Sequence, residues 1–125
     1  MAVPVHRVVN ARTGRVVATA VEEAKGPWRS FRGLMFRKGL PDGHGMFFRS
    51  AKGIHTQFMR FPIDLIYLDK QNRVVKVRPS MAPWRFDFTN ASSVIEMTGG
   101  AAAAADIRAG DQLEFQPATT SMGSA

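Results

Sequence analysis

Residues able to bind ligands or transfer protons are concentrated in one short segment, Ile54–Asp64. His55 carries an imidazole that titrates near neutral pH, Thr56 carries a hydroxyl, and Arg60 carries a guanidinium. Asp64 begins an apolar run, and a loop entering such a strand brings side chains from both parts to one end of a sheet. The spacing therefore predicts a binding site at the start of this strand.

The Asp64 carboxylate needs partners, because it alternates with Ile66 and Leu68 on a strand face that requires burial. An unpaired buried charge costs several kcal/mol or neutralises. The candidate partners are Arg60, Arg85 and backbone N–H groups. Asp64 is therefore either a structural group that satisfies a turn or loop amide, or an orienting carboxylate beside the histidine.

A second segment, Pro83–Phe88, places Arg85 between two aromatic residues, Trp84 and Phe86. An arginine flanked by aromatic rings suits an anion-binding pocket with an apolar wall. The alternative is a loop that Trp84 and Phe86 pin to the core.

A third candidate is Glu96, which shares a strand face with Val94 and Thr98. It is either the ion-pair partner of an arginine or a general base whose pKa is raised by burial. The chain has no cysteine, and its three histidines lack metal-ligand spacing. Nucleophile-elbow, P-loop, zincin and dinucleotide motifs are also absent. We therefore expect neither a metal nor a cofactor.

The positive charge is confined to one half of the chain. Residues 1–60 hold 11 basic and 3 acidic side chains, whereas residues 61–125 hold 6 and 7, giving a net charge of +7. A basic half suggests an anionic partner, such as nucleic acid, a phosphorylated metabolite or a lipid headgroup. The alternative is an arginine-rich surface with no specific partner.

Turn signals divide the chain into short strands and few helices. Residues 3–9 and 15–21 form one predicted hairpin, and Ile63–Leu68 pairs with Arg73–Arg78 in another. Pro27–Lys38 is predicted as a helix, with Pro27 at its first position and Gly39 just past its end. The other expected elements are strands at Met46–Phe48, Ser92–Thr98 and Gln112–Gln116, and one or two helical turns at Ala101–Ala105.

With 125 residues, of which 45% are hydrophobic and 22% charged, the chain suits one globular domain. We predict a mainly β (α+β) fold, a single barrel-like or rolled antiparallel sheet with one or two short helices, over residues 1–116. Residues 117–125 are predicted to be a flexible tail. No stretch approaches the ~20 apolar residues of a membrane span. The sequence shows no signal peptide, which favours a cytoplasmic location, and it gives no indication of oligomeric state.

The order of these segments resembles the family known as domain of unknown function (DUF) 192, over roughly residues 18–116. The pieces that carry the resemblance are Arg32–Arg37, Gly45–Phe48, Ile54–Thr56, Met59–Asp64, Pro83–Arg85, Val94–Glu96, Gly99-Gly100, Ile107 and Gly110-Asp111. Many members read Trp-Met-Lys-Asn-Thr where this chain has Phe58–Pro62, and many carry an export signal. The resemblance implies a compact, mostly β fold, and it supplies no activity and no catalytic residue.

Three functions remain open at this stage. The favoured one is a small binding module for an anionic or polar small molecule, with His55, Arg60 and Arg85 bordering one pocket and Asp64 fixing an arginine from beneath. Thr56, Trp84 and Glu96 complete the predicted ligand site. The second is a small hydrolase or lyase that uses His55 with Asp64 or Glu96. The third, which we rank last because no base-stacking motif is present, is a weak nucleic-acid binder that uses the basic half.

Overall fold

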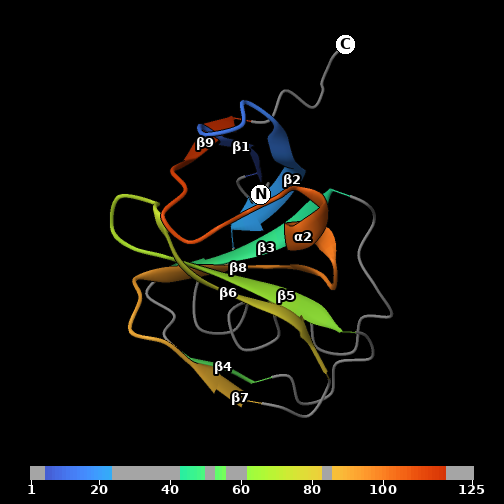
Figure 1. Cartoon of the computed structure of the whole chain (residues 1–125), viewed down its shortest axis with the longest axis vertical. Helices are drawn as coiled ribbons and strands as arrows, with labels where there is room; N and C mark the ends of the chain where they lie inside the picture. The colour runs from blue at the N-terminus through green and yellow to red at the C-terminus, as the bar shows by residue number, and fades with distance from the viewer. Residues whose placement is uncertain (1–4, 24–42, 50–52, 56–61, 83–85, 118–125) are drawn as a thin grey trace.

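The computed structural model describes residues 5–23, 43–49, 53–55, 62–82 and 86–117. Strands make up most of this part of the chain, together with one short helix (Figure 1). In chain order the elements are β1 (Val5–Asn10), β2 (Val16–Glu23), β3 (His44–Arg49), β4 (Gly53–His55), β5 (Ile63–Leu68), β6 (Val74–Met81), β7 (Phe86–Phe88), β8 (Ser93–Thr98), α2 (Ala101–Ala104) and β9 (Leu113–Pro117).

Seven of these strands form one curled sheet in the order β6-β5-β8-β3-β2-β1-β9. All neighbouring pairs are antiparallel except β2 and β3, which run parallel. The two edge strands approach each other at a bridge between Arg73 and Gln112. There the Leu113 N–H donates to the Asn72 carbonyl at 3.0 Å, so the sheet curls almost into a barrel.

The two faces of this sheet bury different clusters. The inner face holds apolar side chains such as Val21, Phe47, Ile66, Ile95 and Leu113, which fill the half-barrel. Cross-strand partners share a face, and successive residues alternate between faces. The residues between those of the inner face therefore point outward, where a second cluster forms from Met46, Phe48, Ile63, Leu65, Tyr67, Met81, Ala91 and Val94.

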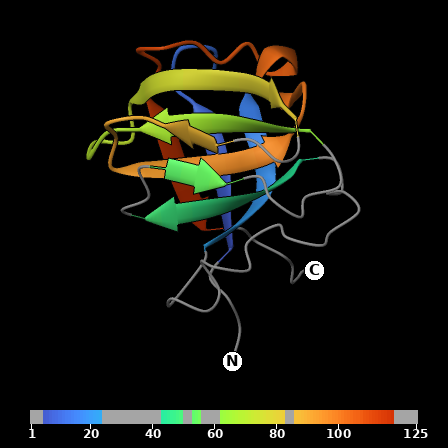
Figure 2. The same ribbon diagram turned by 90° about the horizontal axis from the view of Figure 1, so that it is seen from below.

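A separate two-stranded ribbon, formed by β4 and β7, accompanies the large sheet. Figure 2 shows this ribbon in front of the large sheet when the molecule is viewed from below. The ribbon was not predicted from the sequence, because Pro83–Phe88 was interpreted either as part of an anion-binding pocket or as a loop pinned to the core. The alternation Phe86-Asp87-Phe88 is a strand pattern, but three residues are too few to be distinguished from a turn.

Most sequence predictions that fall on described residues are confirmed. The mainly β class, the rolled sheet, both hairpins and the helical turn after Gly100 are present, and the strands predicted at residues 46–48, 92–98 and 112–116 correspond to β3, β8 and β9. The bounds of these three strands differ from the predicted ones by one or two residues. The parallel β2–β3 pair departs from the all-antiparallel expectation. The predicted Pro27–Lys38 helix and residues 118–125 of the predicted tail lie outside the described residues. No helix within the described ranges is long and apolar enough to cross a membrane.

Candidate functional site

Asp64 lies on the inner face of β5 and is fully buried. Its Oδ1 atom accepts the Ser80 N–H at 2.7 Å and the Gly100 N–H at 3.0 Å, and its Oδ2 atom accepts the Ala102 N–H at 2.7 Å. Gly100 has a φ of 94°, which favours glycine, and it supplies no side chain to cap α2. Asp64 therefore satisfies the first turn of α2 from a distant part of the chain.

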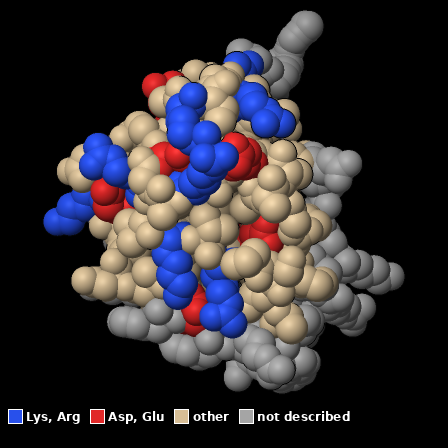
Figure 3. Space-filling view, in the orientation of Figure 1, with Lys and Arg blue, Asp and Glu red and all other residues tan. Residues whose placement is uncertain are grey.

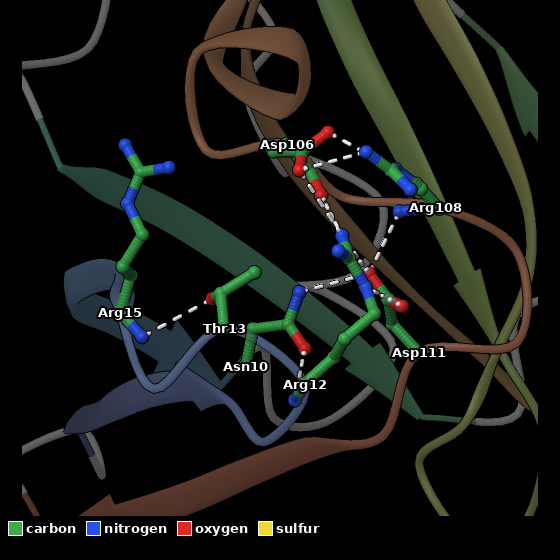
Figure 4. Close-up of polar contacts among 7 residues, drawn as sticks. All are labelled: Asn10, Arg12, Thr13, Arg15, Asp106, Arg108 and Asp111. Atoms are coloured by element: carbon green, nitrogen blue, oxygen red, sulfur yellow. Dashed lines mark hydrogen bonds and ion pairs between the residues drawn. The ribbon is translucent and has the colours of Figure 1, made fainter.

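A second buried carboxylate, Asp111, ties the β1–β2 turn to the segment that follows α2 (Figure 4). Asn10 Nδ2 donates to its Oδ2 atom at 2.8 Å, Arg12 Nε donates to its Oδ1 atom at 2.7 Å, and the Arg108 N–H donates to Oδ2 at 2.8 Å. The hydrogen bond from Arg12 lowers the pKa of Asp111 to about 2. This carboxylate is ionised and fully engaged at neutral pH, which is a structural role.

Asp106 extends this network at the surface. Arg12 and Arg108 both contact its carboxylate, at 3.3 and 3.1 Å. The carboxylate of Asp106 is 42% exposed, so solvent screens these pairs and each contributes little to stability. The sequence predicted a hairpin turn between residues 9 and 15, but it did not predict the contact of this turn with Asp106 and Asp111.

Glu96 differs from both of these aspartates. It lies on the outer face of β8, opposite Met46 of β3 and Leu65 of β5, and only 4% of it is exposed. Its Oε1 atom has no hydrogen-bond partner, and no ion pair joins it to any residue of the described ranges. Burial raises the pKa of this carboxyl to about 8, so at neutral pH the protonated form dominates.

A second unpartnered oxygen lies on the same face. The Tyr67 hydroxyl is fully buried and has no hydrogen-bond partner among the described residues. Tyr67 is opposite Val94, two residues from Glu96 on β8. Burial raises the pKa of the Tyr67 hydroxyl, and the nearby Asp87 carboxylate raises it further. Two diagonal neighbours on this sheet face therefore carry O–H groups that remain protonated at neutral pH.

Ion pairs fasten the β4–β7 ribbon beside this face. Asp87 of β7 is buried, and its carboxylate contacts Lys76 at 3.3 Å and Arg78 at 3.1 Å. Both cations belong to β6 and lie opposite Tyr67 and Leu65, on the outer face. The Lys76 ammonium also lies 5.7 Å from the centroid of the Tyr67 ring. The sequence alone assigned no role to any of these four groups.

The ribbon also brings together two segments that the sequence analysis singled out separately. In its ladder, His55 pairs with Phe86 and Ile54 pairs with Asp87. The side chain of His55, and all of Thr56, Arg60, Trp84 and Arg85, lie outside the described residues.

Asp64 and Glu96 do not lie together. Their cross-strand partners are Met97 and Leu65 respectively, which places Asp64 on the inner face and Glu96 on the outer face. Among the residues of the described ranges, the partners of Asp64 are backbone N–H groups. Of these two acids, Glu96 is the one that lies on the face where the ribbon is attached, so it is better placed for chemistry than Asp64. No group of three potential metal ligands occurs within these ranges.

Comparison with known proteins fits this architecture. The family model DUF192, whose description is "Uncharacterized ACR", matches residues 8–115. The chain belongs to the DUF192 family. A UPF0127 protein of Pyrococcus furiosus is 31% identical to it over 117 residues, which cover 86% of this chain and 97% of that protein. The resemblance noted from the sequence is therefore confirmed.

Two solved structures share the fold of this DUF192 chain. A candidate transcription regulator from Sinorhizobium meliloti superimposes with a TM-score of 0.80 and 22% identity, covering 92% of this chain and 96% of that one. A protein of unknown function from Novosphingobium aromaticivorans gives a TM-score of 0.73 and 28% identity, covering 89% and 83%. At 22% identity the first comparison establishes the fold alone.

Proposed function

We propose that this DUF192 protein is a small binding module, and that its ligand, a polar or anionic small molecule, lies against the outer face at Glu96. The observation that carries the proposal is the buried Glu96 carboxyl, which has no hydrogen-bond or ion-pair partner within the described ranges. Buried polar groups nearly always have a partner, so an unpartnered one points to a bound molecule or ordered water. A protonated carboxyl can donate a hydrogen bond to an anion instead of repelling it.

The β4–β7 ladder supports the extension of this site to the residues predicted from sequence. Thr56 follows His55 in the chain, and Arg85 precedes Phe86. Each is therefore one residue from the cross-strand pair that His55 and Phe86 form. Asp87, next in the chain after Phe86, anchors the ribbon on the outer face through Lys76 and Arg78. We therefore keep the hypothesis that His55, Arg60 and Arg85 border the ligand pocket.

An enzymatic role is the second candidate, and the titration of Glu96 favours it. General acid–base catalysis is most effective when the pKa of the catalytic group is near the working pH. Burial raises the pKa of Glu96 to about 8. In a hydrolase or lyase, Glu96 would be the general acid or base that exchanges a proton with the substrate, and His55 would assist it. Asp64 is a weaker candidate because backbone N–H groups occupy both of its oxygens.

Nucleic-acid binding ranks below both. Several basic side chains already pair with acids, and Figure 3 shows acidic side chains set among the basic ones on one face of the molecule. The paired cations are Arg12, Arg49, Lys76, Arg78 and Arg108. Binding through the remaining charge would be weak, non-specific and strongly salt-dependent.

A thermal-shift screen tests the proposed site. A panel of small carboxylates, phosphate esters and neutral polar metabolites is added to the wild type, to Glu96→Gln and to the matched control Glu114→Gln, whose parent glutamate is exposed on β9. A ligand present at about 100 times its Kd stabilises the native state by about 2.7 kcal/mol, which raises Tm by several degrees. We expect at least one compound to raise the Tm of the wild type and of Glu114→Gln, but not that of Glu96→Gln.

His55→Ala extends the screen to the ribbon, with His44→Ala on β3 as its control. The same compound should lose its effect on His55→Ala and keep it on His44→Ala. If every compound that stabilises the wild type stabilises Glu96→Gln to the same extent, the ligands lie elsewhere and the proposal is contradicted. Mass spectrometry of the incubated compound separates the two leading functions, since a binding module returns it unchanged.

A further inference from the structure

A hollow of about 560 Å³ opens at another place, where β3 ends, β8 begins and β5 turns toward β6. Arg49 and Ser93 line it, and they are cross-strand partners, as are Ser93 and Leu68. Since Leu68 belongs to the inner cluster, this hollow lies on the side of the sheet opposite to Glu96. Its volume is within the range of small-molecule sites.

Arg49 is held in place at the wall of this hollow. Its Nε atom donates to the carboxylate of Glu23, which is buried on β2 and also lies 3.6 Å from the Nε2 atom of His6. Its guanidinium carbon lies 5.3 Å from the centroid of the Phe47 ring. In the described part of the chain, no acceptor occupies the Nη groups of Arg49. The ion pair and the ring contact restrict this guanidinium, whose side chain is 67% exposed, so it loses less freedom than an unpaired arginine when those groups bind an anion.

The rest of the lining is rich in hydrogen-bond donors. The side chains that can donate are Lys70, Asn72, Asn90, Ser92 and Ser93. One carboxylate, Asp69, also lines the hollow, and its Oδ1 atom accepts the N–H groups of Gln71 and Arg73 at 2.8 and 2.9 Å. Asp69 therefore shapes the β5–β6 turn that presents Lys70 and Asn72.

We infer that this hollow is a second ligand site, for a small molecule that carries a phosphate or carboxylate group. Such oxyanions offer several acceptor oxygens in the geometry that the paired Nη groups of an arginine match. The lysine, the amides and the hydroxyls supply further donors around the same space. Ala91 contributes both to the lining of the hollow and to the outer cluster, but none of the charged or polar lining residues belongs to the site proposed at Glu96. The inference therefore does not depend on the function proposed there.

Titration of the purified protein with inorganic phosphate, and separately with citrate, tests this inference. Backbone amide shifts in ¹⁵N–¹H spectra should move saturably at residues 70, 72, 92 and 93 with at least one of the two anions. The anion that binds identifies the preferred oxyanion, and either one supports the site. Arg49→Lys keeps a cation beside Glu23 but removes the paired Nη donors of the guanidinium, and it should weaken anion binding by about tenfold. Lys70→Gln should weaken it by about fivefold.

Two variants serve as controls. Arg15→Gln removes an exposed cation near the opposite end of β2 from Glu23 and should leave binding unchanged. Glu96→Gln should also leave it unchanged, so failure of this site is distinguishable from failure of the proposed function. Non-saturable shifts with both anions, or equal weakening by Arg15→Gln and Arg49→Lys, would overturn the inference, because either result indicates general attraction to a basic protein.

Discussion

Two regions of this DUF192 protein bury carboxylic acids in opposite ways. At the end of the half-barrel near α2, Asp64 and Asp111 each accept at least three hydrogen bonds. On the outer face, Glu96 is equally buried, but its Oε1 atom has no partner within the described ranges. The pKa of Asp111 is lowered to about 2, whereas the pKa of Glu96 is raised to about 8.

The contrast shows that burial alone does not decide what an acid does. Partners stabilise the charged form of Asp111, so it acts as a fixed anion that joins two turns. Without partners, desolvation favours the neutral form of Glu96 and leaves its proton exchangeable near physiological pH. The first region uses its buried acids for stability, whereas the second keeps a buried acid that no described residue engages.

The largest effect is expected at Asp64. Replacing it by alanine leaves one buried and two partly buried N–H groups without an acceptor. Each costs about 1–3 kcal/mol, so Asp64→Ala should lose about 3–5 kcal/mol in the free energy of unfolding. Urea denaturation measures this loss. Asp69→Ala is the control, since its carboxylate accepts two N–H groups in a partly exposed turn and should cost about 1 kcal/mol. Equal losses in both variants would remove the distinction between buried and exposed acids.

Glu96→Gln should gain stability relative to the wild type as pH rises, whereas substitution of a buried acid usually lowers stability. Between its ordinary pKa of 4.5 and its folded value of about 8, the native wild type holds a proton that the unfolded chain has released. Wild-type stability therefore falls as pH rises through this window, by about 3 kcal/mol between pH 4 and pH 7. Glu96→Gln lacks this group, so its stability relative to the wild type should rise by that amount over the same window. A constant difference between the two proteins would contradict a raised pKa.

Asp111→Asn should show the opposite pH dependence with a smaller effect. Its lowered pKa means that the carboxylate stabilises the fold above its ordinary pKa of 3.8, and this contribution is lost as pH falls toward 2. At neutral pH we expect a loss of about 2 kcal/mol, because charge-assisted hydrogen bonds from Arg12 and two other donors are weakened. Asp106→Asn, at the exposed part of the network, should change stability by less than about 1 kcal/mol. Denaturation at pH 7 and pH 3 compares the two variants.

His55→Ala is expected to have the smallest effect on stability, below about 1 kcal/mol, because we assign this residue to ligand binding. A thermal melt beside His44→Ala measures it. Strong destabilisation of His55→Ala alone would instead identify a core histidine, and would remove it from the proposed site.

Much of the fold could be predicted from local patterns. Period-two alternation and turn residues located both hairpins, and alternation also placed Asp64 with Ile66 and Glu96 with Val94 on their correct faces. Alternation within one strand does not show which face curls inward. It therefore could not reveal that Asp64 and Glu96 lie on opposite sides of the sheet, because that depends on the β5–β8 register.

The polar partners were harder to predict for a related reason. Asp111 is about 100 positions from Asn10 and Arg12, and Asp64 caps a helix 36 residues later, so no local window contains both members of either contact. The β4–β7 ribbon has three residues in each strand and depends on ion pairs from β6. Its sequence pattern is too short to be recognised without that tertiary support.

The central claim is that Glu96 is a protonated acid at neutral pH, whereas Asp111 is ionised. Carboxyl ¹³C chemical shifts followed from pH 2 to pH 9 measure both groups in the same sample, with Asp111→Asn and Glu96→Gln used to assign the signals. We expect the Glu96 signal to titrate with a midpoint near pH 8, while the Asp111 signal remains that of a carboxylate down to about pH 3. A Glu96 midpoint at or below about pH 5 would show that the outer face holds an ordinary ion-paired glutamate, and would contradict the account.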